Sequence, residues 1–106
     1  MTKFLCNAFS GQMLDPDKQD VLVRRHRLTK DEVNSMDLTK LESFVGHPDT
    51  AAVLGVTCNR GSIKLQSGDV LIVAQVTGGR LPEGTTVLPE GFGIQFDQYT
   101  IVEVED

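Results

Sequence analysis

The chain contains one long, nearly continuous apolar run at 70–76, and a loop rich in glycine and proline follows it. An apolar run of this length, bounded by turn residues, is typical of a central strand that is buried on both faces of a sheet. Shorter segments at 3–6, 21–28 and 99–104 have apolar or alternating sequences that also favour strands. The sequence therefore predicts a sheet with 70–76 at its centre.

The segment that precedes this central strand alternates between polar and apolar residues. Such alternation, here over 62–65, is typical of a half-buried strand. A tight turn at 66–69 follows, so we expect 62–65 and 70–76 to pair as an antiparallel hairpin. Further along, 89–97 contains two glycines, and we expect it to form a loop.

Two segments, 29–32 and 39–42, have the Ser/Thr-x-x-Glu sequence of a capping box, in which side chains satisfy free N–H groups at a helix start. The second is better placed, because apolar residues follow it at helical spacing, and we expect a helix at about 38–45. Proline favours the first turn of a helix and glycine its end. The stretch 48–54, followed by Gly55, therefore predicts a second helix.

In chain order, the predicted elements are strand, strand, helices, hairpin and strand, which is typical of an α+β domain. A length of 106 residues with 40% hydrophobic residues suits one compact domain over residues 1–106. We expect a single domain with a mixed, mainly antiparallel sheet of about five strands and with helices on one face.

Acidic residues outnumber basic ones, with 15 Asp and Glu against 10 Lys and Arg, giving a formal net charge of -5. This balance disfavours binding to long DNA or RNA, which normally requires a basic surface. The Arg-Arg-His-Arg cluster at 24–27 leaves a small DNA-binding regulator open as an alternative, although the chain has no helix-turn-helix pattern. The same cluster suits a strand at the edge of a sheet, where charges prevent aggregation, and His26 is then a surface residue.

Other features point to a protein of the cytoplasm. The sequence shows no leader and no long apolar run, so we expect neither export nor contact with a membrane. Cys6 and Cys58 lack the C-x-x-C spacing, and we expect both to be reduced, buried packing residues. The chain has no cluster of Cys, His and Asp at metal-ligand spacing, so no metal and no cofactor is expected.

His47 is the strongest candidate for chemistry, because it lies between Gly46 and Pro48 at the predicted start of the second helix. Unpaired backbone N–H groups at a helix start favour a nearby phosphate. A structural role, in which His47 only caps the helix, is also open, and composition alone favours it. Gln75 presents a similar choice, since a polar residue near the end of a buried strand either satisfies the core or faces a site.

Several short segments together resemble elements of the viral anti-CRISPR ring nucleases. They are Asn7 to Ser10, Gly46 and His47 with Thr50, Asn59 and Arg60, 73–76, and 80–84. This family consists of small proteins of archaeal viruses, phages and some bacterial genomes that degrade cyclic tetra-adenylate, the second messenger of type III CRISPR defence. The resemblance runs from about Phe4 to the last strand. It is interrupted after Leu88, where relatives carry a helix and this chain has Pro-Glu-Gly-Phe-Gly.

The resemblance implies a symmetric homodimer with the cyclic nucleotide lying across its two-fold axis. In the reaction it implies, which needs no metal, a ribose 2′-hydroxyl attacks the adjacent phosphate and leaves linear di-adenylate with a 2′,3′-cyclic phosphate. His47 would be the general acid that protonates the departing 5′-oxygen, and Glu83 would act in the site from its loop. The resemblance also implies a set of substrate-binding residues: Asn7, Ser10, Arg60, Gln75 and Arg80.

The residue types suit this chemistry. Attack by an internal hydroxyl needs orientation, a proton for the leaving oxygen and positive charge near the phosphoryl oxygens. One histidine and one or two arginines supply the last two, and the guanidinium fork can bind two phosphate oxygens at once. A module that sequesters a cyclic oligonucleotide without cutting it would use the same pocket without needing His47, so this alternative stays open.

Overall fold

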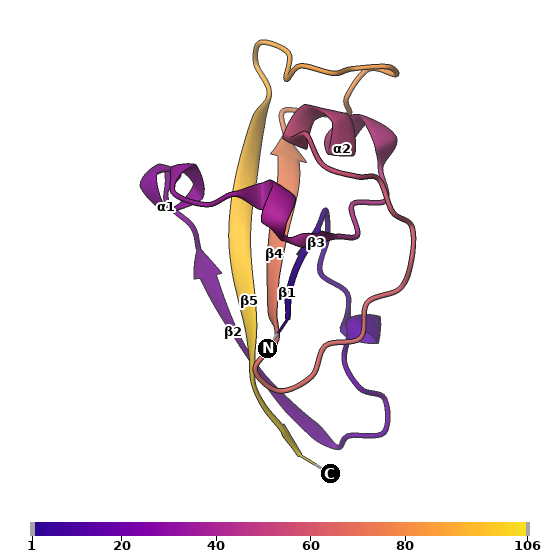
Figure 1. The fold of residues 1–106 in the computed structure, drawn as a ribbon, viewed down its shortest axis with the longest axis vertical. Coiled ribbons are helices and arrows are strands. Elements are labelled where there is room, and N and C mark those ends of the chain that lie inside the picture. The colour runs from indigo at the N-terminus through magenta and orange to yellow at the C-terminus, as the bar shows by residue number, and fades with distance from the viewer. Residues whose placement is uncertain (1, 106) are drawn as a thin grey trace.

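A five-stranded sheet forms the framework of the protein, and the computed structural model describes it over residues 2–105. The strands are β1 (Lys3–Cys6), β2 (Asp20–Arg27), β3 (Glu42–Ser43), β4 (Val70–Thr77) and β5 (Gly93–Glu105). The helices are α1 (Lys30–Asn34) and α2 (Pro48–Leu54), with short 3-10 helices η1 (Gly11–Met13) and η2 (Leu38–Lys40). Figure 1 shows the two long strands, β4 and β5, side by side through the middle of the molecule.

The strand order is β2-β5-β4-β1-β3, and the sheet is mixed. β5 is antiparallel to both β2 and β4, whereas β1 is parallel to both β4 and β3. The α+β class and the five-stranded mixed sheet are confirmed. The expectation of a mainly antiparallel sheet is confirmed as well, because the two antiparallel ladders of β5 have eight residue pairs each, whereas the parallel ladders of β1 have four with β4 and two with β3.

β4 is the central strand that the apolar run predicts. Its residues from Val70 to Ala74 are all buried. Ile72 belongs to the core cluster on one face of the sheet, together with Leu5 from β1. Leu71 belongs to the cluster on the other face, together with Ile101 from β5. Because both faces of the strand are covered, its sequence is continuously apolar and does not alternate between apolar and polar residues.

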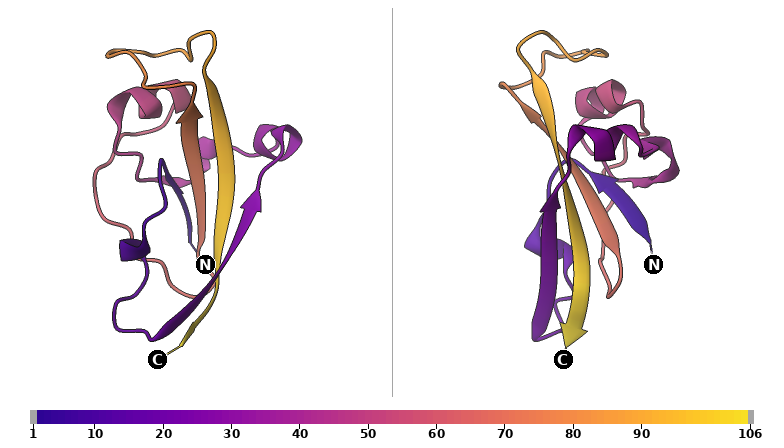
Figure 2. Two further views of the ribbon diagram at one scale, coloured as in Figure 1. Left: turned by 180° about the vertical axis from the view of Figure 1, so that it is seen from behind. Right: turned by 90° about the vertical axis from the view of Figure 1, so that its left-hand side faces the viewer.

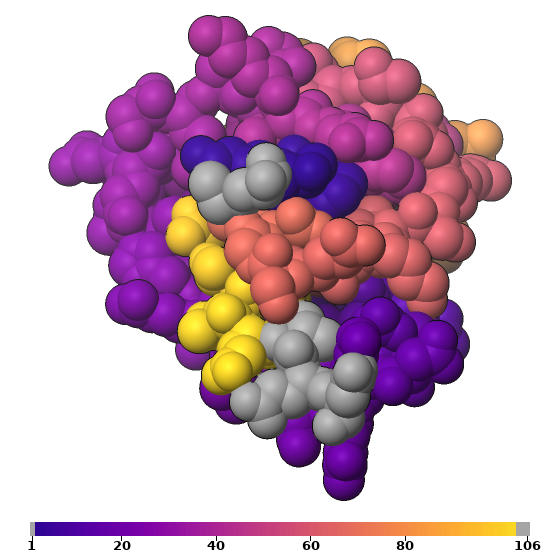
Figure 3. All heavy atoms as spheres, turned by 60° about the horizontal axis from the view of Figure 1, so that its bottom comes forward, coloured from indigo at the N-terminus to yellow at the C-terminus, as the bar shows by residue number. Residues whose placement is uncertain are grey.

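The two α-helices lie on one face of the sheet, as expected, and η1 lies on the other (Figure 2). Figure 3 views the molecule from the end that lies at the bottom of Figure 1. There, the chain around the start of β4 packs between the N-terminal strand and β5. In the described part of the chain, no helix is long and apolar enough to cross a membrane.

The predicted hairpin between 62–65 and β4 does not form. Both edges of β4 are already paired, one with β1 and the other with β5. Ile63 and Leu65 are nevertheless buried, in the core cluster on the face of η1, and the Leu65 N–H donates to the carbonyl of Met13 at 2.7 Å. The alternation in this segment therefore reflects burial against a sheet, not pairing within one.

The predicted helix at 38–45 is also wrong. Its first residues form η2, which Asp37 caps by accepting from the Thr39 N–H at 3.0 Å. The following residues pair with β1 as the short strand β3, and the Phe44 N–H donates to the Leu5 carbonyl at 2.7 Å. Pairing with the neighbouring strand β1 thus outweighs the weak helical periodicity of this segment.

The other helix signals are borne out. Thr29 and Glu32 form a full capping box at the start of α1, each side chain accepting from the backbone N–H of the other. α2 spans the predicted residues and ends at Gly55, whose φ of 72° is the left-handed conformation that glycine adopts readily. At the C-terminal end, 93–97 was expected to be a loop, but it belongs to β5 because it pairs with the last residues of β4.

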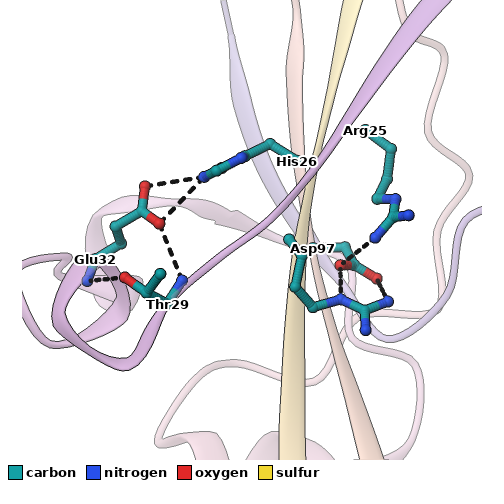
Figure 4. Close-up of polar contacts among 6 residues, drawn as sticks. Arg25, His26, Thr29, Glu32 and Asp97 are labelled. Carbon is teal, nitrogen blue, oxygen red and sulfur yellow. Dashed lines mark hydrogen bonds and ion pairs between the residues drawn. The ribbon is translucent and has the colours of Figure 1, made fainter.

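The charged cluster at 24–27 lies on β2, one of the two edge strands of the described sheet, which confirms the edge-strand interpretation. Arg25 and Arg27 both contact the carboxylate of Asp97 on β5, at 3.6 and 2.6 Å. His26 points the other way and meets Glu32 of α1 at 3.1 Å (Figure 4). The hydrogen bond from Arg27 holds the pKa of Asp97 below its ordinary value of 3.8, and Arg25 adds to this effect.

The buried position of Leu71 predicts a large loss of stability on truncation. Leu71→Ala should lower the free energy of unfolding by about 2–5 kcal/mol, because it removes apolar contacts and leaves a cavity. Leu22→Ala is the matched control, since Leu22 is 56% exposed, and it should change stability by no more than about 0.5 kcal/mol. Urea unfolding followed by circular dichroism measures both, and equal losses would contradict the burial of β4.

The lowered pKa of Asp97 predicts a pH-dependent contribution to stability. Because this pKa is lower in the folded than in the unfolded chain, the stabilisation is fully present above about pH 4 and is lost as the pH falls through the folded pKa. Asp97→Asn should therefore melt at a lower temperature than wild type at pH 7, and the difference should shrink below pH 3.8. Thermal melts between pH 3 and 7 test this, with the exposed Asp17→Asn as a control that should show no such convergence.

Candidate functional site

A pocket of about 220 Å³ lies where β4 ends, beside the start of α2 and the loop that follows β4. Its walls combine residues from four parts of the chain: Asn7, His47, Thr50, Ala74, Gln75, Val76, Gly79, Arg80 and Leu81. Four of the seven site residues predicted from the sequence, namely Asn7, His47, Gln75 and Arg80, are therefore brought together around one cavity.

His47 both caps α2 and faces this pocket. Its Nδ1 accepts a hydrogen bond from the backbone N–H of Thr50 at 3.3 Å, in the N-cap geometry that serine and aspartate usually provide. With Nδ1 acting as an acceptor, the proton of the neutral ring is on Nε2. The structural role left open by the sequence is thus real, and it does not remove the ring from the pocket.

Asn7 fixes the backbone just before His47. It follows the last residue of β1, and its side-chain oxygen accepts from the Gly46 N–H at 3.3 Å. The carbonyl of Gly46 accepts in turn from Nε of Arg60 at 3.0 Å. Arg60 does not line the pocket, but this bond anchors its exposed side chain at the residue next to His47.

Ser10 occupies a separate place. It lines a neighbouring pocket of about 210 Å³ together with Cys6 and Phe44, and its hydroxyl accepts from the Gln12 N–H at 3.3 Å as the cap of η1. The structure therefore gives Ser10 a capping role. Its predicted contact with a ligand stays a prediction.

Glu83 is exposed in the loop between β4 and β5, at the tip of a tight turn. In this turn the N–H and the hydroxyl of Thr85 both donate to the carbonyl of Pro82. Gly84 follows Glu83 with a φ of 81°, and its N–H donates to the carboxylate of Asp49 at 3.0 Å. The loop, orange in Figures 1 and 2, accordingly lies over α2.

The structure resolves the alternative left open for Gln75 and tests the expectation for the two cysteines. Gln75 is exposed and lines the pocket, so it faces the candidate site instead of satisfying the core. Cys6 is buried as expected, but the expectation that Cys58 is buried is wrong. Cys58 follows α2 on the surface, where its thiol donates to the Gly46 carbonyl at 3.7 Å.

Sequence reasoning missed the contact between Asp49 and Gly84. Thirty-five positions separate the two residues, and no local pattern links a carboxylate in a helix to a turn that far along the chain. The burial of Leu81, which is 7% exposed, was equally hidden, because a single apolar residue in a loop has no periodicity. The hydrogen bond to Asp49 and the burial of Leu81 both help to determine where the loop lies.

Comparisons with known proteins place the chain in a family. No curated protein matches its sequence. Among solved structures, the fold is similar to B116 of Sulfolobus turreted icosahedral virus (STIV), with a TM-score of 0.75 and 23% identity over 94% of this chain and 99% of that chain. At this level of identity the likeness shows a shared fold. A family model described as STIV B116-like matches residues 3–93. Because this match spans most of the chain, the protein belongs to the STIV B116-like family.

Proposed function

We propose that the protein is a metal-independent ring nuclease that converts cyclic tetra-adenylate to linear di-adenylate with a 2′,3′-cyclic phosphate, and so shuts off type III CRISPR signalling. The observation that carries the proposal is the single pocket at the end of β4, into which separate parts of the chain bring His47, Arg80, Gln75 and Asn7. These are residues that the ring-nuclease resemblance assigns to acid catalysis and to ligand binding.

In the proposed reaction, the 2′-oxygen of a ribose forms a bond to the adjacent phosphorus while the bond from phosphorus to the 5′-oxygen breaks. His47 gives a proton to the departing 5′-oxygen, and the carboxylate of Glu83 suits the removal of the proton that the 2′-hydroxyl releases. An imidazolium carries a proton on Nδ1 as well, so the hydrogen bond from Thr50 must break when His47 becomes the acid. The phosphates of the bound ring favour that cation.

Arginine side chains supply the positive charge that a phosphoryl group in transfer requires. Arg80 faces the pocket from the loop after β4, and Arg60 is anchored to the carbonyl of Gly46, the residue before His47. The net charge of -5 is compatible with this arrangement, because the cations need to gather only at one cavity. In the homodimer that we propose, two copies of each group would surround a ring of four nucleotides.

His47→Asn tests the catalytic role directly. Asparagine is a good N-cap, so the variant should keep α2 and bind cyclic tetra-adenylate, while cleavage in the presence of EDTA should fall by about 10²–10⁴-fold because the proton donor is lost. His26→Ala changes the other histidine, which lies on the outer strand β2, and should cleave like wild type. Chromatography of the products and calorimetric binding measure the two effects.

The outcomes separate the proposal from its alternative. Cleavage by wild type that survives in His47→Asn would remove the histidine from the mechanism. Tight binding without cleavage by wild type would favour the sequestering module. If wild type neither binds nor cleaves the ring, this member of the family has the fold without the proposed function.

Arg80→Ala should weaken binding of cyclic tetra-adenylate by about tenfold or more, because it removes one charge-assisted phosphate contact from the pocket. The dependence of the dissociation constant on salt should also become shallower. Arg24→Ala is the matched control, since Arg24 is exposed on β2, and its binding should equal that of wild type. Titrations at two salt concentrations distinguish a local phosphate contact from a general change in net charge.

A further inference from the structure

We propose that Asp49 is a positioning residue of this site: its carboxylate holds the 82–85 turn, and with it Glu83, against the start of α2 beside His47. The inference rests on the proposed ring-nuclease function. It concerns a residue that does not itself line the pocket and that acts through the turn it holds.

One hydrogen bond joins the neighbourhoods of the two proposed catalytic groups. Asp49 is two residues after His47, in the first turn of α2, and its Oδ1 accepts from the Gly84 N–H at 3.0 Å. Gly84 directly follows Glu83. The bond therefore limits how far the turn that carries Glu83 can move relative to His47.

The turn behaves as a unit, so holding one residue holds its neighbour. Pro82 accepts from the N–H and the hydroxyl of Thr85, which closes the turn on both sides of Glu83. The φ of 81° at Gly84 suits the third position of such a turn, where a side chain would strain the backbone. Burial of Leu81 anchors the same segment immediately before the turn.

No regular secondary structure holds the loop in place. Residues 78–92 are all described, and none of them is in a helix or strand. Loops of this length without secondary structure are commonly functional. Because a displacement of about 1 Å in a catalytic group can cost about 100-fold in rate, a fixed tie near Glu83 has a direct catalytic consequence.

We call the hydrogen bond from the Gly84 N–H to the Asp49 carboxylate the latch. A role of Asp49 confined to its own helix makes a different prediction from the latch. A carboxylate in the first turn of a helix interacts favourably with the helix dipole, and asparagine loses that charge. As an acceptor for the Gly84 N–H, in contrast, asparagine can replace aspartate through its amide oxygen. Asp49→Asn therefore discriminates between the two roles.

The experiment uses Asp49→Ala, Asp49→Asn and Asp31→Ala. Asp31 is the matched control, because it occupies the same second position of α1. Single-turnover cleavage of saturating cyclic tetra-adenylate should be slowed about tenfold or more in Asp49→Ala, with the dissociation constant changed by less than about threefold. Asp49→Asn should recover most of the rate, and Asp31→Ala should match wild type.

A second readout needs no ligand. Amide hydrogen exchange at Gly84, followed by NMR, should be faster in Asp49→Ala than in wild type or Asp31→Ala. Unchanged exchange at Gly84 would overturn the latch. A folded Asp49→Ala that cleaves at the wild-type rate, or an Asp49→Asn as slow as Asp49→Ala, would overturn the positioning role. If wild type cleaves no ring while Gly84 stays protected, the proposed function fails and the positioning role with it, although the latch itself is established.

Discussion

The enclosure of the first part of β4 is the constraint on which the rest of the structure depends. The strand is buried from Val70 to Ala74, and from Val70 to Val73 it pairs along both edges, so no further element can pair with it there. Enclosure ends at Gln75, which is exposed. The candidate site lies at that boundary, with the polar side chain of Gln75 in its wall.

His47 links the stability of the fold to the proposed chemistry. The hydrogen bond between its Nδ1 and the Thr50 N–H starts α2 and at the same time sets the position of the ring beside the pocket. Asn7 and Arg60 both contact the backbone of Gly46, one through its N–H and the other through its carbonyl. The loop before the helix is therefore held on both sides, so the backbone that carries the His47 ring stays fixed even when the hydrogen bond from Thr50 breaks.

The elements that the sequence predicted correctly carry strong local signals. The apolar run of β4 and the proline and glycine that bound α2 depend little on distant residues. The errors at 38–45 and 62–65 have the opposite origin. Their periodicity reports which side chains are buried, but whether a segment pairs depends on partners far away, such as the Leu5 carbonyl that accepts from Phe44. Periodicity alone cannot identify those partners.

The candidate site shows the same division. The resemblance to ring nucleases selects residues that the fold gathers around one pocket, yet it says nothing of how the loop above them is held. After Leu88 this chain reaches Gly93 without a helix and then continues as β5. The buried Leu81 side chain and the hydrogen bond from Gly84 to Asp49 are two contacts that join the loop to the domain. Part of the geometry of the candidate site thus depends on the half-buried carboxylate of Asp49, and this dependence follows from the fold and not from any local pattern in the sequence.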